Sequence, residues 1–223
     1  MLGTIVNSLA IIGGSLAGFI LKEGIPDKIN DSIMKGLALC IMVIGITGAI
    51  KSENMILVIS SIVIGTVIGE LIDIDKWLKK LGDFIESRLK GRGGRISEGF
   101  VTASLVYCVG AMAIVGSLNS GLKGDHQILF TKAMLDGISA IMFTSTLGIG
   151  VAISAVSVFA YQGIITLLAS FVQGVLTPPV VIEISAVGSV LIMGLGFNML
   201  GLTKIKVANL LPAVFIPIIY FLF

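Results

Sequence analysis

The residues from Ile128 to Leu176, ILFTKAMLDGISAIMFTSTLGIGVAISAVSVFAYQGIITLLASFVQGVL, decide the fold of this chain. The run is apolar apart from isolated polar side chains, and it contains two charged residues, Lys132 and Asp136. At about 1.5 Å per residue it is too long for one membrane crossing of about 20 residues, and it fits two. We predict that the chain reverses at Gly148-Ile149-Gly150; one long kinked helix or a re-entrant hairpin is the alternative.

The composition of the whole chain agrees with this interpretation. Hydrophobic residues make up 56% of the 223 residues and charged residues only 13%, and the mean hydropathy is +1.08. Such a chain would not stay in solution, so we predict an all-α, polytopic transmembrane helix bundle. Residues 1–223 are expected to form a single integral membrane domain, with three spans in 1–75, a cytoplasmic amphipathic segment in 76–97 and the other spans in 98–223.

Eight apolar segments are predicted to span the membrane, or seven if one crossing is lost between Ile128 and Leu176. The predicted spans are Leu2–Leu21, Ile33–Ile50, Met55–Ile72, Phe100–Leu118, Ile128–Leu147, Gly148–Gln173, Val181–Leu202 and Val207–Phe223.

The basic residues predict the orientation, because cytoplasmic loops hold the excess of Lys and Arg. With eight spans and the N-terminus outside, only Lys51 and Lys123 lie outside, Lys132 is buried, and the others of the 15 Lys and Arg residues lie inside. Seven spans would move Lys204 and Lys206 to the outside, so eight is favoured. The first apolar run is interpreted as a retained helix rather than a secretory signal.

The polar segment between the third and fourth predicted spans has apolar residues at helical spacing. They are Ile74, Trp77, Leu78, Leu81, Phe84, Ile85 and Leu89, and basic side chains such as Lys76 and Lys79 lie between them. We predict an amphipathic helix on the inner membrane face that contacts anionic lipid and ends in the flexible Gly91-Arg92-Gly93-Gly94-Arg95. A docking site for a cytosolic partner is the alternative, and a nucleic-acid partner is not expected.

Two patterns concern the packing of the spans. Gly14 to Gly18 and Gly65 to Gly69 have the Gly-x-x-x-Gly spacing that lets helices approach closely, either within the chain or in a homo-oligomer. The first three predicted spans also align with the last three, Gly3 to Gly14 with Gly163 to Gly174 and Asp31 to Gly36 with Glu183 to Gly188. Because the copies would cross the membrane in opposite directions, this alignment suggests an inverted repeat, which is typical of secondary transporters.

Lys132 and Asp136 are the main candidates for a functional site. They are four residues apart, so they face the same side of a helix, about 6 Å and about 12 Å from its outer end, and Ser139 continues the stripe. Charged groups at this depth are costly and usually functional, which favours a cation, proton or substrate site; a structural ion pair is the alternative.

Other polar residues within the spans are weaker candidates. Glu70 is either an interfacial carboxylate or the entrance to a path, and the amides of Asn7, Gln162 and Asn198 are either ligands or bonds between helices. The single histidine, His126, lies in an outer loop. With no cysteine pair, phosphate-binding loop or serine elbow in the sequence, we expect neither an enzyme, nor a cofactor, nor a metal centre.

Several polar and glycine positions match a known family in order along the chain. They are Gly3-Thr4-Ile5-Val6-Asn7, Tyr107 to Ser117, Gly121 to Asp125, Lys132 to Gly137 and Tyr161 to Thr166. On these motifs the sequence resembles the YdfK/YqgA-like bacterial membrane proteins, a domain family of unknown function. The resemblance implies an integral protein of the bacterial cytoplasmic membrane, and it implies no substrate.

The leading hypothesis from the sequence is a small transporter or ion-conducting protein. Asp136 would bind a cation or proton, Lys132 would be its charge partner, and Gln162 and Asn198 would add neutral ligands. A non-transporting scaffold or sensor that acts through the amphipathic cytoplasmic segment is the alternative. The expected partners are therefore the lipid bilayer and a small ion or solute.

Overall fold

The computed structural model describes residues 1–22, 26–88 and 96–222, and the regular elements in these ranges are helices. Six of these helices are long and apolar enough to cross a membrane. A bent pair, α5 (Ile96–Cys108) and α6 (Ala111–Leu122), is long and apolar enough to count as a seventh span if its two helices cross together, and a re-entrant loop is the other arrangement it fits. The last apolar segment, Val207–Leu222, is shorter. The all-α class is confirmed, and the arrangement is consistent with about eight spans.

The outer surface of the helices is apolar. Leu71, Phe171 and Ile56 are 83%, 82% and 77% exposed, and many other large aliphatic side chains point outward. A surface of this kind would drive a soluble protein to aggregate, whereas lipid tails solvate it well. The protein is therefore a membrane protein with several transmembrane helices.

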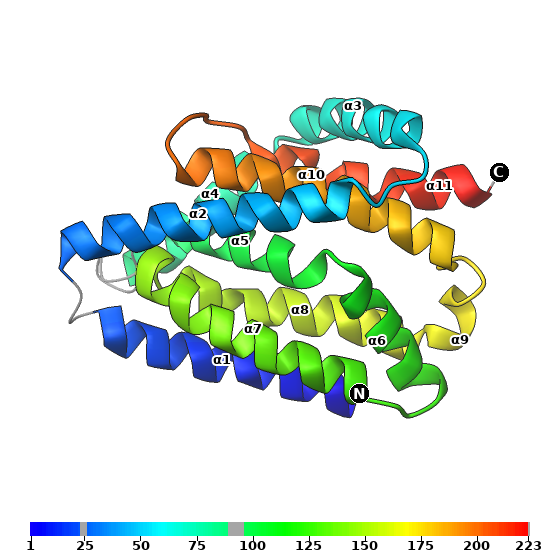
Figure 1. Cartoon of the computed structure of the whole chain (residues 1–223), viewed down its shortest axis with the longest axis horizontal. Helices are drawn as coiled ribbons and strands as arrows, with labels where there is room; N and C mark the ends of the chain where they lie inside the picture. Colours follow the sequence, from blue (N-terminus) through cyan, green and yellow to red (C-terminus); the bar gives the residue numbers. More distant parts are fainter. Residues whose placement is uncertain (23–25, 89–95, 223) are drawn as a thin grey trace. The chain divides into compact units, whose positions relative to one another are not determined.

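The chain divides into two compact units. Unit 1 comprises residues 1–31 and 79–173, and unit 2 comprises residues 32–78 and 174–223. The helices of unit 1 are α1 (Leu2–Lys22), α5, α6, α7 (Gln127–Leu147), α8 (Gly150–Leu167) and the short α9 (Ala169–Val172) (Figure 1). Helix α1 belongs to unit 1, whereas the next two predicted spans belong to unit 2.

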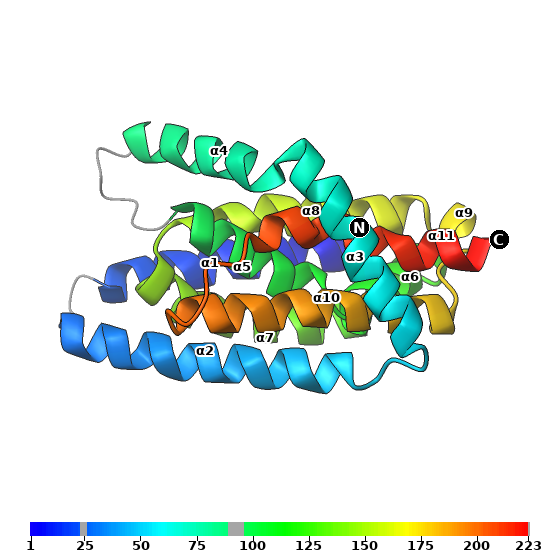
Figure 2. The same cartoon turned by 90° about the horizontal axis from the view of Figure 1, so that it is seen from above.

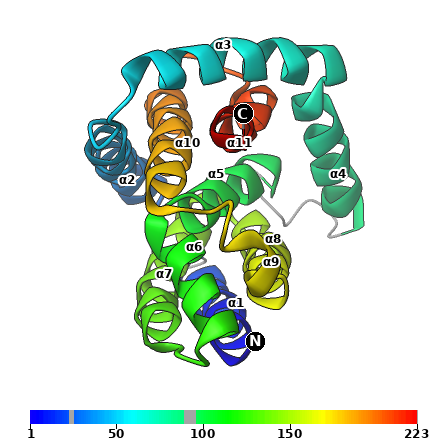
Figure 3. The ribbon, with the colours of Figure 1, turned by 90° about the vertical axis from the view of Figure 1, so that its right-hand side faces the viewer.

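In unit 1, α1 packs closely along α7 and runs in the same direction. A Cβ atom on Gly14 would collide with the backbone oxygen of Gly137, and one on Gly18 would collide with that of Ile141. The first Gly-x-x-x-Gly pair thus forms an intramolecular contact. On its other side α1 meets α8 in the opposite direction, because Thr4 near the start of α1 contacts Thr166 near the end of α8. Figure 3 shows these three helices nearly end on.

The predicted reversal between the fifth and sixth spans is confirmed. Helix α7 ends at Leu147, and α8 begins at Gly150. Gly148 between them has φ 87°, a conformation that L side chains rarely adopt. Close packing also requires a glycine at position 150, since a Cβ atom there would collide with the backbone of Ile96.

The predicted span from Phe100 to Leu118 is broken into two helices. Helix α5 ends at Cys108, α6 begins at Ala111, and their axes differ by 61°. Gly110 lies in the break with φ 134°, which only glycine adopts without strain. A glycine inside an apolar run is compatible with either a straight or a broken helix, so the run itself did not predict the break.

Unit 2 contains most of α2 (Asp27–Ala49), α3 (Met55–Ile72), α10 (Pro178–Met199), η1 (Val207–Phe215) and α11 (Ile216–Leu222). Helices α2 and α10 run side by side in opposite directions (Figure 2), because Gly45 and Gly48 lie against Met193 and Ser189. Gly65 and Gly69 of α3 lie against the backbone of Ala213 and Asn209 in η1. The second Gly-x-x-x-Gly pair is therefore also an intramolecular contact.

The predicted amphipathic segment is helical in its described part. Helix α4 (Ile74–Arg88) begins in unit 2 and continues into unit 1. Trp77 and Phe84 are 66% and 57% exposed, and Lys76 and Lys79 are also exposed. The predicted flexible Gly91–Arg95 stretch lies outside the described residues.

Candidate functional site

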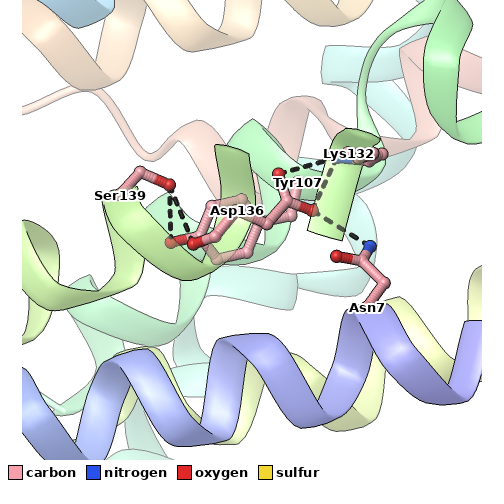
Figure 4. Close-up of polar contacts among 5 residues, drawn as sticks. All are labelled: Asn7, Tyr107, Lys132, Asp136 and Ser139. Carbon is pink, nitrogen blue, oxygen red and sulfur yellow. Dashed lines mark hydrogen bonds and ion pairs between the residues drawn. The ribbon is translucent and has the colours of Figure 1, made fainter. Parts of the chain in front are cut away.

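Lys132 and Asp136 form an ion pair inside unit 1. The Lys132 Nζ atom donates to both carboxylate oxygens of Asp136, at 2.9 Å to Oδ1 and 2.7 Å to Oδ2. Lys132 is 7% exposed and Asp136 is 6% exposed. Both residues lie on α7, one helical turn apart, as their spacing predicts. Figure 4 shows the ammonium and the carboxylate pointing toward one another.

A second helix supplies a further donor to the carboxylate. Asn7 of α1 donates from Nδ2 to Asp136 Oδ2 at 3.0 Å. Close packing of α1 on α7 makes this bond possible, because Gly137 next to Asp136 lies directly against Ala10 and Gly14. The carboxylate therefore accepts hydrogen bonds from two helices, and its charge is balanced by a single ammonium group.

Tyr107 of α5 borders the pair on another side. Its ring centroid lies 5.9 Å from Lys132 Nζ, within the range of a cation–π contact. The Ser139 hydroxyl lies 3.3 Å from the Tyr107 hydroxyl and 3.0 Å from the Asp136 backbone oxygen, and its single proton is donated to one of them at a time. Tyr107 is completely buried. The predicted stripe of Lys132, Asp136 and Ser139 is therefore one connected polar cluster (Figure 4).

The break between α5 and α6 lies opposite this cluster. Tyr107, at the end of α5, contacts Ser139, and Gly116 of α6 lies against Leu129. Lys132 and Asp136 lie between Leu129 and Ser139 on α7, and therefore between the contacts that α6 and α5 make with this helix. The end of a helix exposes backbone carbonyls and the negative end of its dipole, both of which favour a cation nearby.

Two buried amides of unit 1 have atoms without hydrogen-bond partners in the described part of the chain. These are the Oδ1 atom of Asn7 and both amide atoms of Gln162, and both residues are 0% exposed. Thr4 contacts Thr166 across the antiparallel α1 and α8. Asn7 is one turn after Thr4, and Gln162 is one turn before Thr166, so the two amides lie at the same level. Unsatisfied buried amides are costly and call for an explanation.

Two other predicted site residues lie in unit 2 and have local partners. Asn198 donates from Nδ2 to the Ile205 backbone oxygen at 2.7 Å, and its Oδ1 accepts from Thr203 and from the Ile205 amide. Its side chain therefore fixes the loop after α10. Glu70 accepts a hydrogen bond from Lys206 at 3.3 Å, and both side chains are about half exposed. This bond raises the pKa of Lys206, and Glu70 fits an interfacial carboxylate.

Tyr107 and Glu183 have buried polar roles that were not predicted from the sequence. Tyr107 lay within the family motif, but nothing in its spacing indicated contact with α7. Glu183 of α10 is 2% exposed. It accepts hydrogen bonds from the Ser52 hydroxyl at 2.7 Å and from the backbone amides of Glu53 and Asn54 at 2.9 and 3.1 Å. An acidic residue in an apolar run was the available signal, as it was for Asp136.

Comparison with known proteins identifies relatives over almost the whole chain. Residues 2–222 match a family model described as a protein of unknown function, DUF554. The uncharacterized membrane protein YdfK of Bacillus subtilis (strain 168) is 37% identical over 97% of this chain and 94% of its own length. The uncharacterized protein YqgA of Escherichia coli (strain K12) is 28% identical over 96% and 93%. No solved structure matches the chain.

Proposed function

Since the chain belongs to the DUF554 family, whose description assigns no activity, we propose a function from the chain's own site: a small membrane transporter or ion-conducting protein. In this proposal Asp136 binds a cation or a proton within the membrane, and Lys132 is its charge partner. Asn7 and Gln162 supply neutral amide oxygens. Asn198, which the sequence also suggested as a ligand, is left out because its amide is bonded within its own loop.

The observation that carries the proposal is the position of the ion pair opposite the broken span. Discontinuous helices at membrane depth commonly form the ion and substrate sites of secondary transporters, because the break frees backbone carbonyls. A structural ion pair alone would need neither the break nor the partnerless amides of Asn7 and Gln162. Together these features favour a site that exchanges ligands.

The pairing of helices supports an inverted repeat within this proposal. The aligned segments Asp31 to Gly36 and Glu183 to Gly188 lie in α2 and α10, whereas Gly163 to Gly174 covers only the end of α8 and α9. Helices α2 and α10 are in contact and run antiparallel. Helix α3 and η1, the next pair, also meet with opposite residue order. Two copies of opposite membrane orientation would produce such pairs.

Flux measurement in proteoliposomes tests the proposal. Purified protein is reconstituted, a gradient of Na⁺, K⁺ or H⁺ is imposed, and ion movement is followed with an indicator dye. We expect flux from the unmodified chain and its loss in Asp136→Asn. The matched control is Asp125→Asn, which changes an exposed carboxylate whose Oδ1 bond to the Gln127 amide an asparagine retains. Undiminished flux in Asp136→Asn would remove this carboxylate from the mechanism.

A membrane scaffold or sensor is the second candidate, and α4 favours it. Exposed Trp77 beside exposed Lys76 and Lys79 is a combination suited to an anionic membrane surface. The double change Lys76→Gln and Lys79→Gln should abolish such a role and leave ion flux intact. Binding to anionic vesicles that the double variant loses, in a chain that carries no ion, would favour α4 over the ion pair.

A further inference from the structure

We propose that a cation reaches Asp136 through the interface between α1 and α8, with part of its hydration water still attached. Ser8 and Gln162 bind the hydrated cation on this route. Ile11 and Val158 form an apolar barrier that closes the interface beyond the site. This inference rests on the proposed function, because it requires a cation that binds Asp136. It adds the route, the hydration state of the ion and the barrier.

One contact fixes the register of α1 against the antiparallel α8. The hydroxyl oxygens of Thr4 and Thr166 lie 3.5 Å apart. Ser8 is one turn after Thr4 on the same face of α1, and Gln162 is one turn before Thr166 on α8, so both lie at the same level. Ser8 is 7% exposed and Gln162 is completely buried, whereas the neighbouring Leu9 is 60% exposed. Ser8 therefore faces the interior of unit 1, and Leu9 faces lipid.

Four polar atoms at this level have no hydrogen-bond partner among the described residues. They are the Ser8 Oγ atom, the Asn7 Oδ1 atom and both amide atoms of Gln162. A bare cation would satisfy the oxygen atoms, but the Gln162 Nε2 atom is a donor and needs an acceptor. Water offers both a donor and an acceptor, and buried polar groups without protein partners commonly bind it. A cation that retains part of its water therefore fits this level better than a bare ion.

Asn7 joins this level to the ion pair. Its Nδ2 atom donates to Asp136 Oδ2 at 3.0 Å, and its Oδ1 atom is one of the four atoms without a described partner (Figure 4). Asn7 and Ser8 are adjacent on α1, so one side chain reaches the carboxylate and the next lies level with Gln162. A cation at Ser8 and Gln162 therefore has its next ligand in the Asn7 amide oxygen.

Thr4 and Thr166 continue the polar interface toward the end of unit 1 at which α1 begins. Gly121 at the end of α6 lies against the Thr166 backbone oxygen, so the connection between α6 and α7 belongs to the same end. Lys123 and Asp125 in this connection are exposed. Exposed charged side chains are expected outside the hydrocarbon core, where they meet water. The route therefore opens at this end of unit 1.

In the opposite direction the interface is apolar for one turn. Ile11 lies two turns after Thr4 on α1, Val158 lies about two turns before Thr166 on α8, and both are completely buried. Polar side chains resume one turn later at Ser15, whose buried Oγ atom has no described partner. A narrow apolar layer excludes water and the ions that water carries. Ile11 and Val158 therefore separate two polar levels.

Cysteine labelling tests the route without requiring ion flux. Ser8→Cys and Leu9→Cys are introduced separately into a chain whose Cys40 and Cys108 are replaced by alanine, and each protein is reconstituted in vesicles. A small charged methanethiosulfonate reagent is added. We expect the buried Ser8→Cys to react severalfold faster than the exposed Leu9→Cys, because the first thiol meets water and the second meets lipid. Equal reaction, or faster reaction at Leu9→Cys, would show a dry interface and overturn the route.

Replacement of the Gln162 amide tests binding on the route. Gln162→Leu has a similar size and leaves no described neighbour without a hydrogen-bond partner, so the fold should tolerate it. We expect its Na⁺ or K⁺ flux in proteoliposomes to fall severalfold. Gln173→Leu makes the same change at an exposed position of unit 1 and should retain full flux. Size-exclusion chromatography checks the folding of both variants, and undiminished flux in folded Gln162→Leu would overturn the binding role.

A hydroxyl in the apolar layer tests the barrier. Val158→Thr keeps the size of the side chain and makes the layer easier to hydrate, so Na⁺ or K⁺ flux should rise severalfold. Val156→Thr is the matched control, because Val156 is 69% exposed on the same helix. Ile11→Ala widens the layer from α1 and should also raise flux. Flux equal to that of the unmodified chain in both barrier variants would overturn the barrier.

The outcomes distinguish failure of the route from failure of the proposed function. If the unmodified chain carries Na⁺ or K⁺ and Asp136→Asn does not, but Ser8→Cys is unreactive and Gln162→Leu retains full flux, the route is wrong and the proposed function stands. If the unmodified chain carries neither ion, the cation route and the proposed cation transport are both wrong, whatever the labelling of Ser8→Cys shows.

Discussion

Asp136 is the residue on which most of the site's interactions converge. It accepts from Lys132 on its own helix and from Asn7 on α1, and its backbone oxygen accepts from Ser139. Removing charges from water costs several kcal/mol per ion, so burial of the pair must be offset by these bonds. The pair is therefore sensitive to the loss of one partner and much less sensitive to the loss of both.

This sensitivity predicts the stability of variants at the two charged positions. Asp136→Asn and Lys132→Met each leave one buried charge without its partner and should destabilise the fold by about 3 to 5 kcal/mol. The double variant Lys132→Met with Asp136→Leu replaces the pair by apolar side chains and should recover most of that loss. Unfolding in detergent, followed by tryptophan fluorescence, measures all three; equal destabilisation by the double variant would contradict this account.

At the residue scale the sequence predicted the charged pair and missed its surroundings. Lys132, Asp136, Ser139 and Asn7 are polar residues in apolar spans, and helical periodicity is enough to place the first three together. Tyr107 comes from another helix. Its contact with Ser139 depends on how α5 packs on α7, which involves residues far apart in the chain and has no local signal.

Among the elements, the contact between α1 and α7 depends on the absence of side chains. Gly14→Ala would place a methyl group against the Gly137 backbone oxygen and should cost about 1 to 3 kcal/mol. Gly13→Ala is the matched control, because a Cβ atom on the neighbouring glycine meets no atom within 4 Å. Thermal unfolding of both variants in detergent checks the difference, and similar midpoints would argue against this packing.

Glu183 anchors the connection between α2 and α3 to α10. Glu183→Leu would leave the Ser52 hydroxyl and two backbone amides without their acceptor, so it should destabilise the fold by at least about 1 to 3 kcal/mol. Ser52→Ala removes only one of these donors and should cost less. Proteolysis of the loop between α2 and α3 should be faster in Glu183→Leu. Unchanged stability and cleavage would contradict the anchoring role.

Predictability differed between elements for physical reasons. The length of an apolar run is enough to predict a span such as α3, and paired glycines are enough to predict the turn between α7 and α8. Both signals are local features of the sequence. The break between α5 and α6 also contains a glycine, but a glycine alone does not predict a break, because Gly65 and Gly69 lie within the continuous helix α3. Packing against neighbouring helices decides which glycine bends a span, so the break required the structure.

Across the whole molecule, the distribution of basic residues predicts an even number of crossings with the N-terminus outside. This topology is tested by introducing one cysteine at a time into a variant in which Cys40 and Cys108 are replaced by alanine. Lys51→Cys and Lys123→Cys should react with an impermeant maleimide added to intact cells. Lys79→Cys and Lys204→Cys, which are also at exposed positions, should react only after the membrane is permeabilised. Labelling of Lys204→Cys in intact cells would instead support seven spans.

The central claim is that the Lys132–Asp136 pair binds a transported cation rather than only stabilising the bundle. The most direct measurement is Na⁺ and K⁺ flux in proteoliposomes containing the double variant Lys132→Met with Asp136→Leu, compared with the unmodified chain at equal amounts of folded protein. Our account predicts a folded double variant without flux of either ion. Flux equal to that of the unmodified chain would contradict it and leave the pair with a structural role.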